Sequence, residues 1–341
     1  MNYTQEDLEQ LHNALISLQI IVSIPVLSVC LYISYKLYKL ATINANLKLI
    51  VIITTLSYTV AITEHALLAS VPQQVYSVKE GQYFNALLYY TAALGINYLC
   101  FIFSFKYPVI AIERTVAYRR VKTYDSEGNV FGLKLIKNLS FLSIVLLIIK
   151  IVLIWKTTHG EDIDERLQKT LNVFHHVPGF LFDVIIGTLG MIHCVFTLNS
   201  LMSKVKNQYC CSLTESYEIR QTKCTLQWVK KMLCAFIGLC IIVFPFTIVL
   251  FYLYMYRGYD TDKMEIQIII QILSILVDGY TFITTMMMYC EFPHLKKAII
   301  YDFPCVFPTV SPNHLSKEAE TETYFNNFEE LMNAKYKKRK G

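Results

Sequence analysis

Long uninterrupted apolar runs dominate the sequence, and most polar residues lie between them. Seven runs hold about 20 or more residues each, enough for a helix to cross a hydrocarbon core of about 30 Å. The runs lack the alternation of apolar and polar residues that is typical of membrane β-barrel strands. The pattern predicts spans at Leu15–Leu37, Leu47–Ser70, Phe84–Ile112, Leu135–Trp155, Val173–Leu201, Met232–Tyr256 and Ile266–Cys290.

Composition agrees with this pattern. Hydrophobic residues make up 54% of the 341 residues, and the mean hydropathy is +0.41. Charged residues make up only 17%, against about 25% in a typical soluble domain. The numbers exclude a soluble enzyme, a disordered protein and a fibrous protein. The expected fold class is an all-α membrane protein, a seven-transmembrane helix bundle.

The distribution of Lys and Arg predicts the orientation in the bilayer. Segments beside the spans carry six Lys and Arg residues on the N-terminal side and 17 on the other side. Because Lys and Arg concentrate in cytoplasmic segments, we expect the N-terminus outside and the C-terminus in the cytoplasm. The predicted organisation is an extracellular tail at 1–14, a bundle at 15–303 and a flexible cytoplasmic tail at 304–341. The first dozen residues lack Lys and Arg, so no cleaved signal peptide is expected.

Three features outside the spans are candidates for modification or membrane contact. Asn2 begins an Asn-Tyr-Thr glycosylation sequon on the predicted outer side. Cys305 is a candidate for palmitoylation, with a free thiol as the alternative. All ten cysteines lie in spans or on the predicted cytoplasmic side, so we expect no structural disulfide. A short helix on the inner membrane surface is predicted after the last span, from the spacing of Phe292, Leu295, Ile299 and Phe303.

Seven helices with an outer N-terminus are the layout of G-protein-coupled receptors. The third span ends in Glu113-Arg114, at the predicted cytoplasmic boundary. An Arg in this place can be held by the neighbouring acid at rest and then released to a G protein. The alternative is an ordinary boundary pair whose long side chains reach the lipid headgroups.

The exit from this span resembles that of nematode serpentine chemoreceptors of the alpha, alpha-beta, beta and epsilon classes. The matching residues are Ile112-Glu113-Arg114-Thr115, Tyr118 and Lys122-Thr123-Tyr124-Asp125. A second match, Leu213–Thr222, precedes the sixth span. Ser216 stands there where the family has Arg, and Gln221-Thr222 where it has Glu-Asn, so the class stays open. The resemblance implies a chemosensory receptor in the plasma membrane of sensory neurons, with a small-molecule chemical ligand and a heterotrimeric G protein as partners.

The sixth span supplies two further candidates. A basic face on its cytoplasmic extension is predicted to contact the G protein, or else anionic lipid. Pro245, in the middle of the span, predicts a kink that either lets the inner half of the helix move or remains static. The residues of the basic face are Arg220, Lys223, Lys230 and Lys231.

Charged and ionisable residues within the spans indicate where a ligand pocket lies, because such residues are costly in lipid. The candidates are Glu64, His65, Asp183 and Asp278. Asp278 is also expected to form a buried polar link with Lys106. Lys150 is predicted to reach the outer surface without a functional role.

Two other classes of protein compete with the receptor. A seven-span metal hydrolase needs three or four converging ligands, and the histidines lack a suitable spacing. A ligand-gated seven-span channel of the insect olfactory type requires an inner N-terminus, against the charge distribution. The last span has no Asn-Pro-x-x-Tyr motif and no Lys for retinal, so the chain is not rhodopsin-like. We expect no enzyme activity, no metal, no cofactor and no nucleic-acid partner.

Overall fold

A computed structural model describes residues 4–121, 123–124, 128–158, 162–171, 177–206, 213–259 and 263–303. Every regular element within these ranges is a helix. The chain divides into a unit that ends at Leu295, which holds the bundle, and a second unit that begins at Lys296. The predicted tail at 304–341 lies outside the described residues, as does Asn2.

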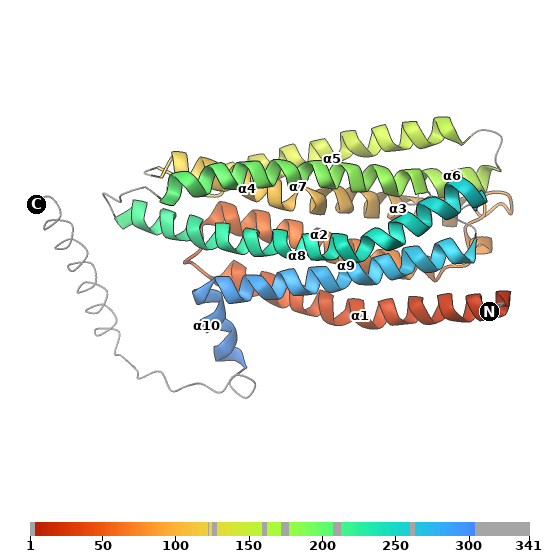
Figure 1. Cartoon of the computed structure of the whole chain (residues 1–341), viewed down its shortest axis with the longest axis horizontal. Helices are drawn as coiled ribbons and strands as arrows, with labels where there is room; N and C mark the ends of the chain where they lie inside the picture. The colour runs from red at the N-terminus through yellow and green to blue at the C-terminus, as the bar shows by residue number, and fades with distance from the viewer. Residues whose placement is uncertain are drawn as a thin grey trace, which may run out of the picture. The chain divides into compact units, whose positions relative to one another are not determined.

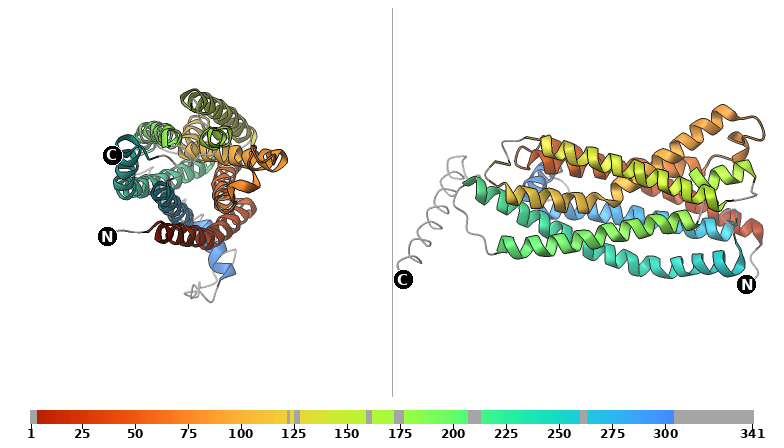
Figure 2. Two further views of the ribbon diagram at one scale, coloured as in Figure 1. Left: turned by 90° about the vertical axis from the view of Figure 1, so that its right-hand side faces the viewer. Right: turned by 90° about the horizontal axis from the view of Figure 1, so that it is seen from above.

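Seven described helices are long and apolar enough to cross a membrane, which confirms the predicted spans. They run side by side in Figures 1 and 2. Most extend beyond the apolar runs, since backbone hydrogen bonding continues into the flanking polar residues. The seven are α1 (Gln5–Lys39), α2 (Ala45–Ala69), α3 (Tyr83–Ser104), α5 (Val130–Thr157), α7 (Val177–Lys206), α8 (Leu213–Arg257) and α9 (Met264–Glu291).

Shorter helices complete the described chain. The 3-10 helix η1 (Gln73–Val75) follows α2, and α6 (Ile163–Leu171) precedes α7. Helix α6 lies at the same end of the bundle as the start of α1, the predicted outer end (Figure 1). Helix α10 (Pro293–Asp302) follows α9 where the sequence predicts a short helix.

The third span is broken into two helices at Phe105. Helix α3 ends at Ser104, and α4 (Lys106–Arg119) continues the span to the predicted cytoplasmic side. Pro108 lies in the first turn of α4 and cannot donate a hydrogen bond to the carbonyl of Ser104, four residues earlier. From the sequence alone, Pro108 is expected to bend the third span about one turn before Glu113. The structure places the break at Phe105, just before the proline.

Helix α4 occupies a central place in the bundle. It contacts α2, α5, α7 and α8, while α1 packs between α2 and α9. Helix α8 is continuous through Pro245, and its ribbon changes direction in its second half (Figure 1). The membrane-spanning part of α8 buries few side chains, whereas its first turns pack closely. The interior of the bundle therefore lies around α2, α4 and α9.

Candidate functional site

Arg114 is completely buried at the predicted cytoplasmic end of the bundle and joins two spans. Its Nε and Nη2 atoms donate to the two carboxylate oxygens of Glu113, each at 2.5 Å. Its Nη1 atom reaches Glu218 Oε2 at 3.5 Å. Because Glu218 belongs to α8, the guanidinium links α4 to the first turns of the sixth span.

Two neutral side chains complete this arrangement. Tyr124, in the loop after α4, donates its hydroxyl to Glu113 Oε1 at 2.7 Å. Asn44, which caps α2 through its Oδ1 atom, donates its Nδ2 to Glu218 Oε1 at 3.3 Å. We call Arg114, Glu113, Glu218, Tyr124 and Asn44 the Arg114 cluster. It gathers groups from three segments that are distant in the sequence.

The charges of the Arg114 cluster depend on one another. One guanidinium faces two carboxylates, all of them buried, and removal of either partner from a buried ion pair leaves an uncompensated charge. Burial, with the nearby Glu113 carboxylate, raises the pKa of Tyr124, so its hydroxyl remains a donor at neutral pH. In the structure Arg114 is therefore in contact with both carboxylates at once.

The predicted basic face lies beside this cluster on α8. Arg220, Lys223, Lys230 and Lys231 are all exposed, while Trp228 and its neighbours on the opposite face are buried. Lys231 also pairs with Glu291 at the end of α9. The exposed basic side chains thus continue from the helix that holds Glu218.

Lys150 does not reach the outer surface, which corrects the prediction for this residue. It is buried, and its ammonium group donates to Asp183 Oδ2 at 2.6 Å and to Asn97 Oδ1 at 2.9 Å. The cause is the rotation of α5, whose buried side includes Ser143, Lys150 and Ile154. The pair links α5 to α7 and α3 inside the membrane-spanning region.

The expected link between Asp278 and Lys106 does not form. Lys106 donates to Thr55 Oγ1 at 2.8 Å and lies 5.8 Å from the ring of Trp228. Asp278 Oδ2 instead accepts from Ser23 at 3.3 Å. The two residues are both buried, but each faces a different neighbouring helix.

Two of the four predicted pocket residues line a cavity inside the bundle. This inner chamber has a volume of about 270 Å³, and its wall includes His65 and Asp183. The rest of the wall is mainly apolar or aromatic, from α2, α3, α7, α8 and α9. Glu64 lies toward Gly95 of α3, and neither Glu64 nor Asp278 lines the chamber.

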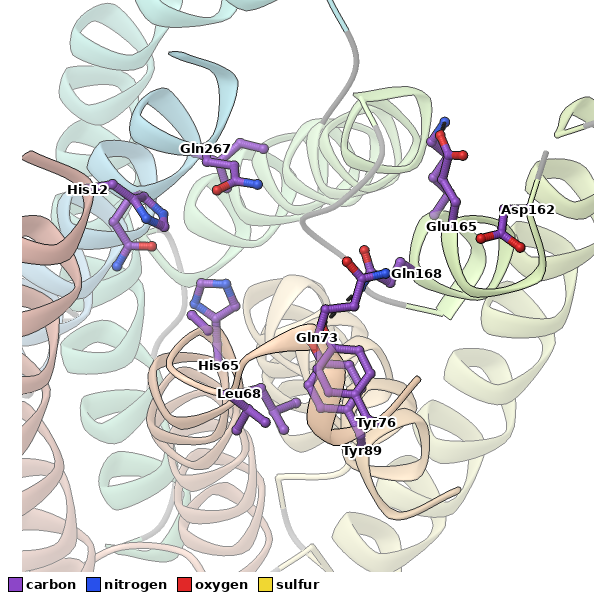
Figure 3. Close-up of a pocket in the computed structure, with 15 residues that line it drawn as sticks. His12, His65, Leu68, Gln73, Tyr76, Tyr89, Asp162, Glu165, Gln168 and Gln267 are labelled. Atoms are coloured by element: carbon purple, nitrogen blue, oxygen red, sulfur yellow. Dashed lines mark hydrogen bonds and ion pairs between the residues drawn. The ribbon is translucent and has the colours of Figure 1, made fainter. Parts of the chain in front are cut away.

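A larger and more polar cavity, the outer vestibule, lies at the predicted outer end. Its volume is about 550 Å³, and Figure 3 shows His12 and Gln267 facing it from one side and Gln168 and Glu165 from the other. His65 and Ile270 line both cavities. Between the two cavities Gln271 donates to Gln19, whose Nε2 lies 3.5 Å from His65 Nδ1.

Asp164 in α6 holds one wall of the outer vestibule in place. Its carboxylate accepts from the Ser77 hydroxyl at 2.5 Å and from the backbone N–H of Val78 at 2.7 Å. Burial alone would raise the pKa of Asp164, but these hydrogen bonds, with that from the Lys79 N–H, outweigh it and lower the pKa below its ordinary value. The carboxylate therefore ties the loop after α2 to α6.

No group of His, Cys, Asp and Glu that could hold a metal ion is found among the described residues. The seven cysteines in the described ranges are free thiols. Cys305, the palmitoylation candidate, and Asn2, the glycosylation candidate, both lie outside those ranges.

The sequence interpretation missed Glu218 and the inward direction of Lys150. Glu218 lies on the side of α8 that carries the buried Thr222, Thr225 and Val229, opposite the basic face. Gly132 and Ser143 share a buried side of α5 with Lys150. Two signals in the sequence could have identified these features. Glu218 is an acid opposite the basic face, and Lys150 is in register with small residues of the same helix.

A scan of the chain against protein-family models finds no match, and a search of curated proteins also finds none.

Proposed function

We propose that this protein is a chemosensory G-protein-coupled receptor of the nematode serpentine type. The observation that carries the proposal is the Arg114 cluster, which joins the third and sixth spans at the predicted cytoplasmic end. The resemblance of Ile112–Thr115 and Leu213–Thr222 to these chemoreceptors supports the finer assignment, and the two motifs contain Arg114 and Glu218 respectively.

In the proposed mechanism the structure corresponds to the resting state. A small-molecule ligand in the inner chamber contacts α3, α7, α8 and α9, and its binding favours an arrangement in which α8 moves away from α4. The movement breaks the longer Arg114–Glu218 contact, while Glu113 keeps its two short hydrogen bonds. Arg114 and the basic face then meet an inserted helix end of the G protein, whose carbonyls carry partial negative charge.

A variant of Arg114 tests the proposal most directly. The readout is recruitment or nucleotide exchange of a set of G proteins in cells that express the full chain, at matched surface density. Arg114→Ala should strongly reduce coupling, because it removes a charge-assisted contact worth about 1.5–3 kcal/mol, or roughly tenfold or more. Arg114→Lys should also couple weakly, since Lys lacks the planar fork of donors. Normal coupling by both variants would contradict the proposal.

Topology provides a second test, independent of any ligand. An epitope tag at Met1 should stain on intact cells, and a tag at Gly341 only after permeabilisation, as the Lys and Arg distribution predicts. The opposite pattern would contradict the receptor and favour a channel with an inner N-terminus. A tag at each end of the same chain provides the matched control for expression.

A further inference from the structure

One side of the inner chamber borders the outer vestibule. Another side lies between α7 and α8. The chamber wall includes Val184 and Thr188 of α7 and Cys240 of α8. All three residues are exposed at the surface of the helix bundle. Val184 adjoins Ile185, which is 58% exposed, and Cys240 adjoins Ile241, which is 68% exposed. These neighbours lie on helix surfaces that face lipid in a membrane, so the chamber meets the bilayer here.

The packing of α7 and α8 is uneven along their length. Toward the predicted outer end, Val177 and Leu250 are fully buried in one hydrophobic cluster with residues of α9. Nearer the middle, Gly187 lines the chamber and contributes no side chain, and Val184 and Cys240 remain exposed. The opening therefore lies within the membrane-spanning part of both helices.

Polar side chains close the other boundary of the chamber. Gln271 is hydrogen-bonded to Gln19, and Gln19 lies within hydrogen-bond distance of His65. Gln19 and Gln271 are almost fully buried, at 0% and 3% exposure. A ligand that came from the outer vestibule would have to separate these buried polar groups, which is costly unless it replaced their hydrogen bonds.

The chamber wall carries one hydrogen-bond acceptor that is not satisfied. Asp183 Oδ2 accepts from Lys150, but its Oδ1 atom is buried and has no hydrogen-bond partner among the described residues. Because Lys150 already balances the charge of this carboxylate, a second cation would gain little. A neutral hydroxyl can supply the missing donor, and a buried acceptor without a donor is unfavourable.

We propose that the ligand of the inner chamber is a small lipophilic molecule with one neutral hydrogen-bond donor, such as an alcohol or phenol, which enters from the bilayer between α7 and α8. The proposal rests on the proposed function only in treating the chamber as the ligand site. Partition into the bilayer concentrates such molecules beside the opening. The apolar wall holds the body of the molecule, and the Asp183 carboxylate, which lines the chamber, accepts its hydrogen bond.

Photolabelling of the purified full-length protein in lipid nanodiscs tests the ligand class. The probes are three aryl trifluoromethyl diazirines that share one apolar body. One carries a benzyl alcohol, the second carries its methyl ether, and the third lacks the oxygen-containing group. We expect saturable labelling of chamber residues in 183–188 and 236–243 by the alcohol, about tenfold above that by the ether and the hydrocarbon. Equal and non-saturable labelling by all three would show only contact with lipid and would overturn the proposal.

Two tryptophan variants test the route of entry with the alcohol probe. Val184→Trp should narrow the opening and reduce chamber labelling after short incubation by about tenfold, because a narrower route slows entry of the probe. Ile185→Trp changes the next residue, which faces lipid but does not line the chamber, and should label as the unaltered protein does. Gln267→Trp narrows the outer vestibule and should also leave labelling unchanged. Loss of labelling in Gln267→Trp but not in Val184→Trp would place the entrance outside and overturn the proposed route.

These outcomes are separate from those of the coupling experiments. Photolabelling requires no G protein, so it can succeed in a chain that does not couple. An Arg114 variant can lose coupling whether or not the alcohol probe binds. Failure of the ligand proposal and failure of the receptor proposal are therefore distinguishable.

Discussion

Glu218→Gln is the substitution that most directly tests the role of the Arg114–Glu218 contact. It removes the charge of the carboxylate on α8 while it keeps an amide oxygen that can accept from Asn44. If the Arg114–Glu218 contact holds the resting state, the variant should show raised basal coupling in the absence of ligand. Glu113→Gln should change basal coupling less, because Glu113 keeps its hydrogen bonds to Arg114 in both states of the proposed mechanism.

The size of the effect follows from the geometry of the contact. Opposite charges 3.5 Å apart attract by about 5 kcal/mol at an effective dielectric constant of 20. Desolvation and the repulsion between the carboxylates of Glu113 and Glu218 offset most of this attraction. Charge-assisted hydrogen bonds contribute about 1.5–3 kcal/mol net, and the length of this one favours the lower value. About 1.5 kcal/mol corresponds to a rise in basal activity of about tenfold.

The assay is basal G-protein recruitment in cells, normalised to the amount of this protein at the cell surface. Glu291→Gln is the matched control, because it also removes a charge that pairs with α8, through Lys231. Lys231 is 58% exposed, so solvent screens this pair far more than the buried contact of Glu218, and basal recruitment should hardly change. Equal basal activity in Glu218→Gln and the unaltered protein would refute the role given to this contact.

Three further predictions concern stability, measured by thermal unfolding of the purified protein. Gly132→Ala should lower the melting temperature, at a cost of about 1–3 kcal/mol, because the added Cβ would lie 3.0 Å from backbone and side-chain atoms of Asn46, whereas Gly238→Ala should not, since nothing lies within 4 Å there. Asp164→Asn should lower the melting temperature at pH 7, and the difference from the unaltered protein should shrink below pH 3.8. The reason is that a carboxylate with a lowered pKa stabilises the fold above its ordinary pKa and loses that effect as it is protonated. Lys150→Met should cost about 3–5 kcal/mol by leaving a buried carboxylate without its cation, and replacing that carboxylate with an apolar side chain as well should restore most of the loss.

The spans could be predicted from the sequence because their signal is local. A run of about 20 apolar residues specifies a membrane helix whatever its neighbours are, and the seven predicted runs correspond to the seven spans. Pro108 likewise acts within one turn, so a bend in the third span could be predicted, though its position at Phe105 depends on which residues remain hydrogen-bonded.

Partners across helices could not be predicted in the same way. The contact between Arg114 and Glu218 joins residues 104 positions apart, and it depends on how α8 is rotated about its axis. Lys150 illustrates the same limit, because its depth is readable from the hydropathy but its direction is set by the packing of α5 against α3 and α7. The rotation of each helix is a property of the whole bundle.

The break at Phe105 has a mechanical consequence for the third span. An unbroken α-helix resists bending because backbone hydrogen bonds connect each turn to the next. Pro108 removes one of these hydrogen bonds at the break. Cys100 and Phe103, on α3, line the chamber, whereas Arg114 is carried by α4. The third span therefore consists of two stiff helices joined at a flexible point. Helix α4 can tilt relative to α3 at a smaller elastic cost than a continuous helix would impose.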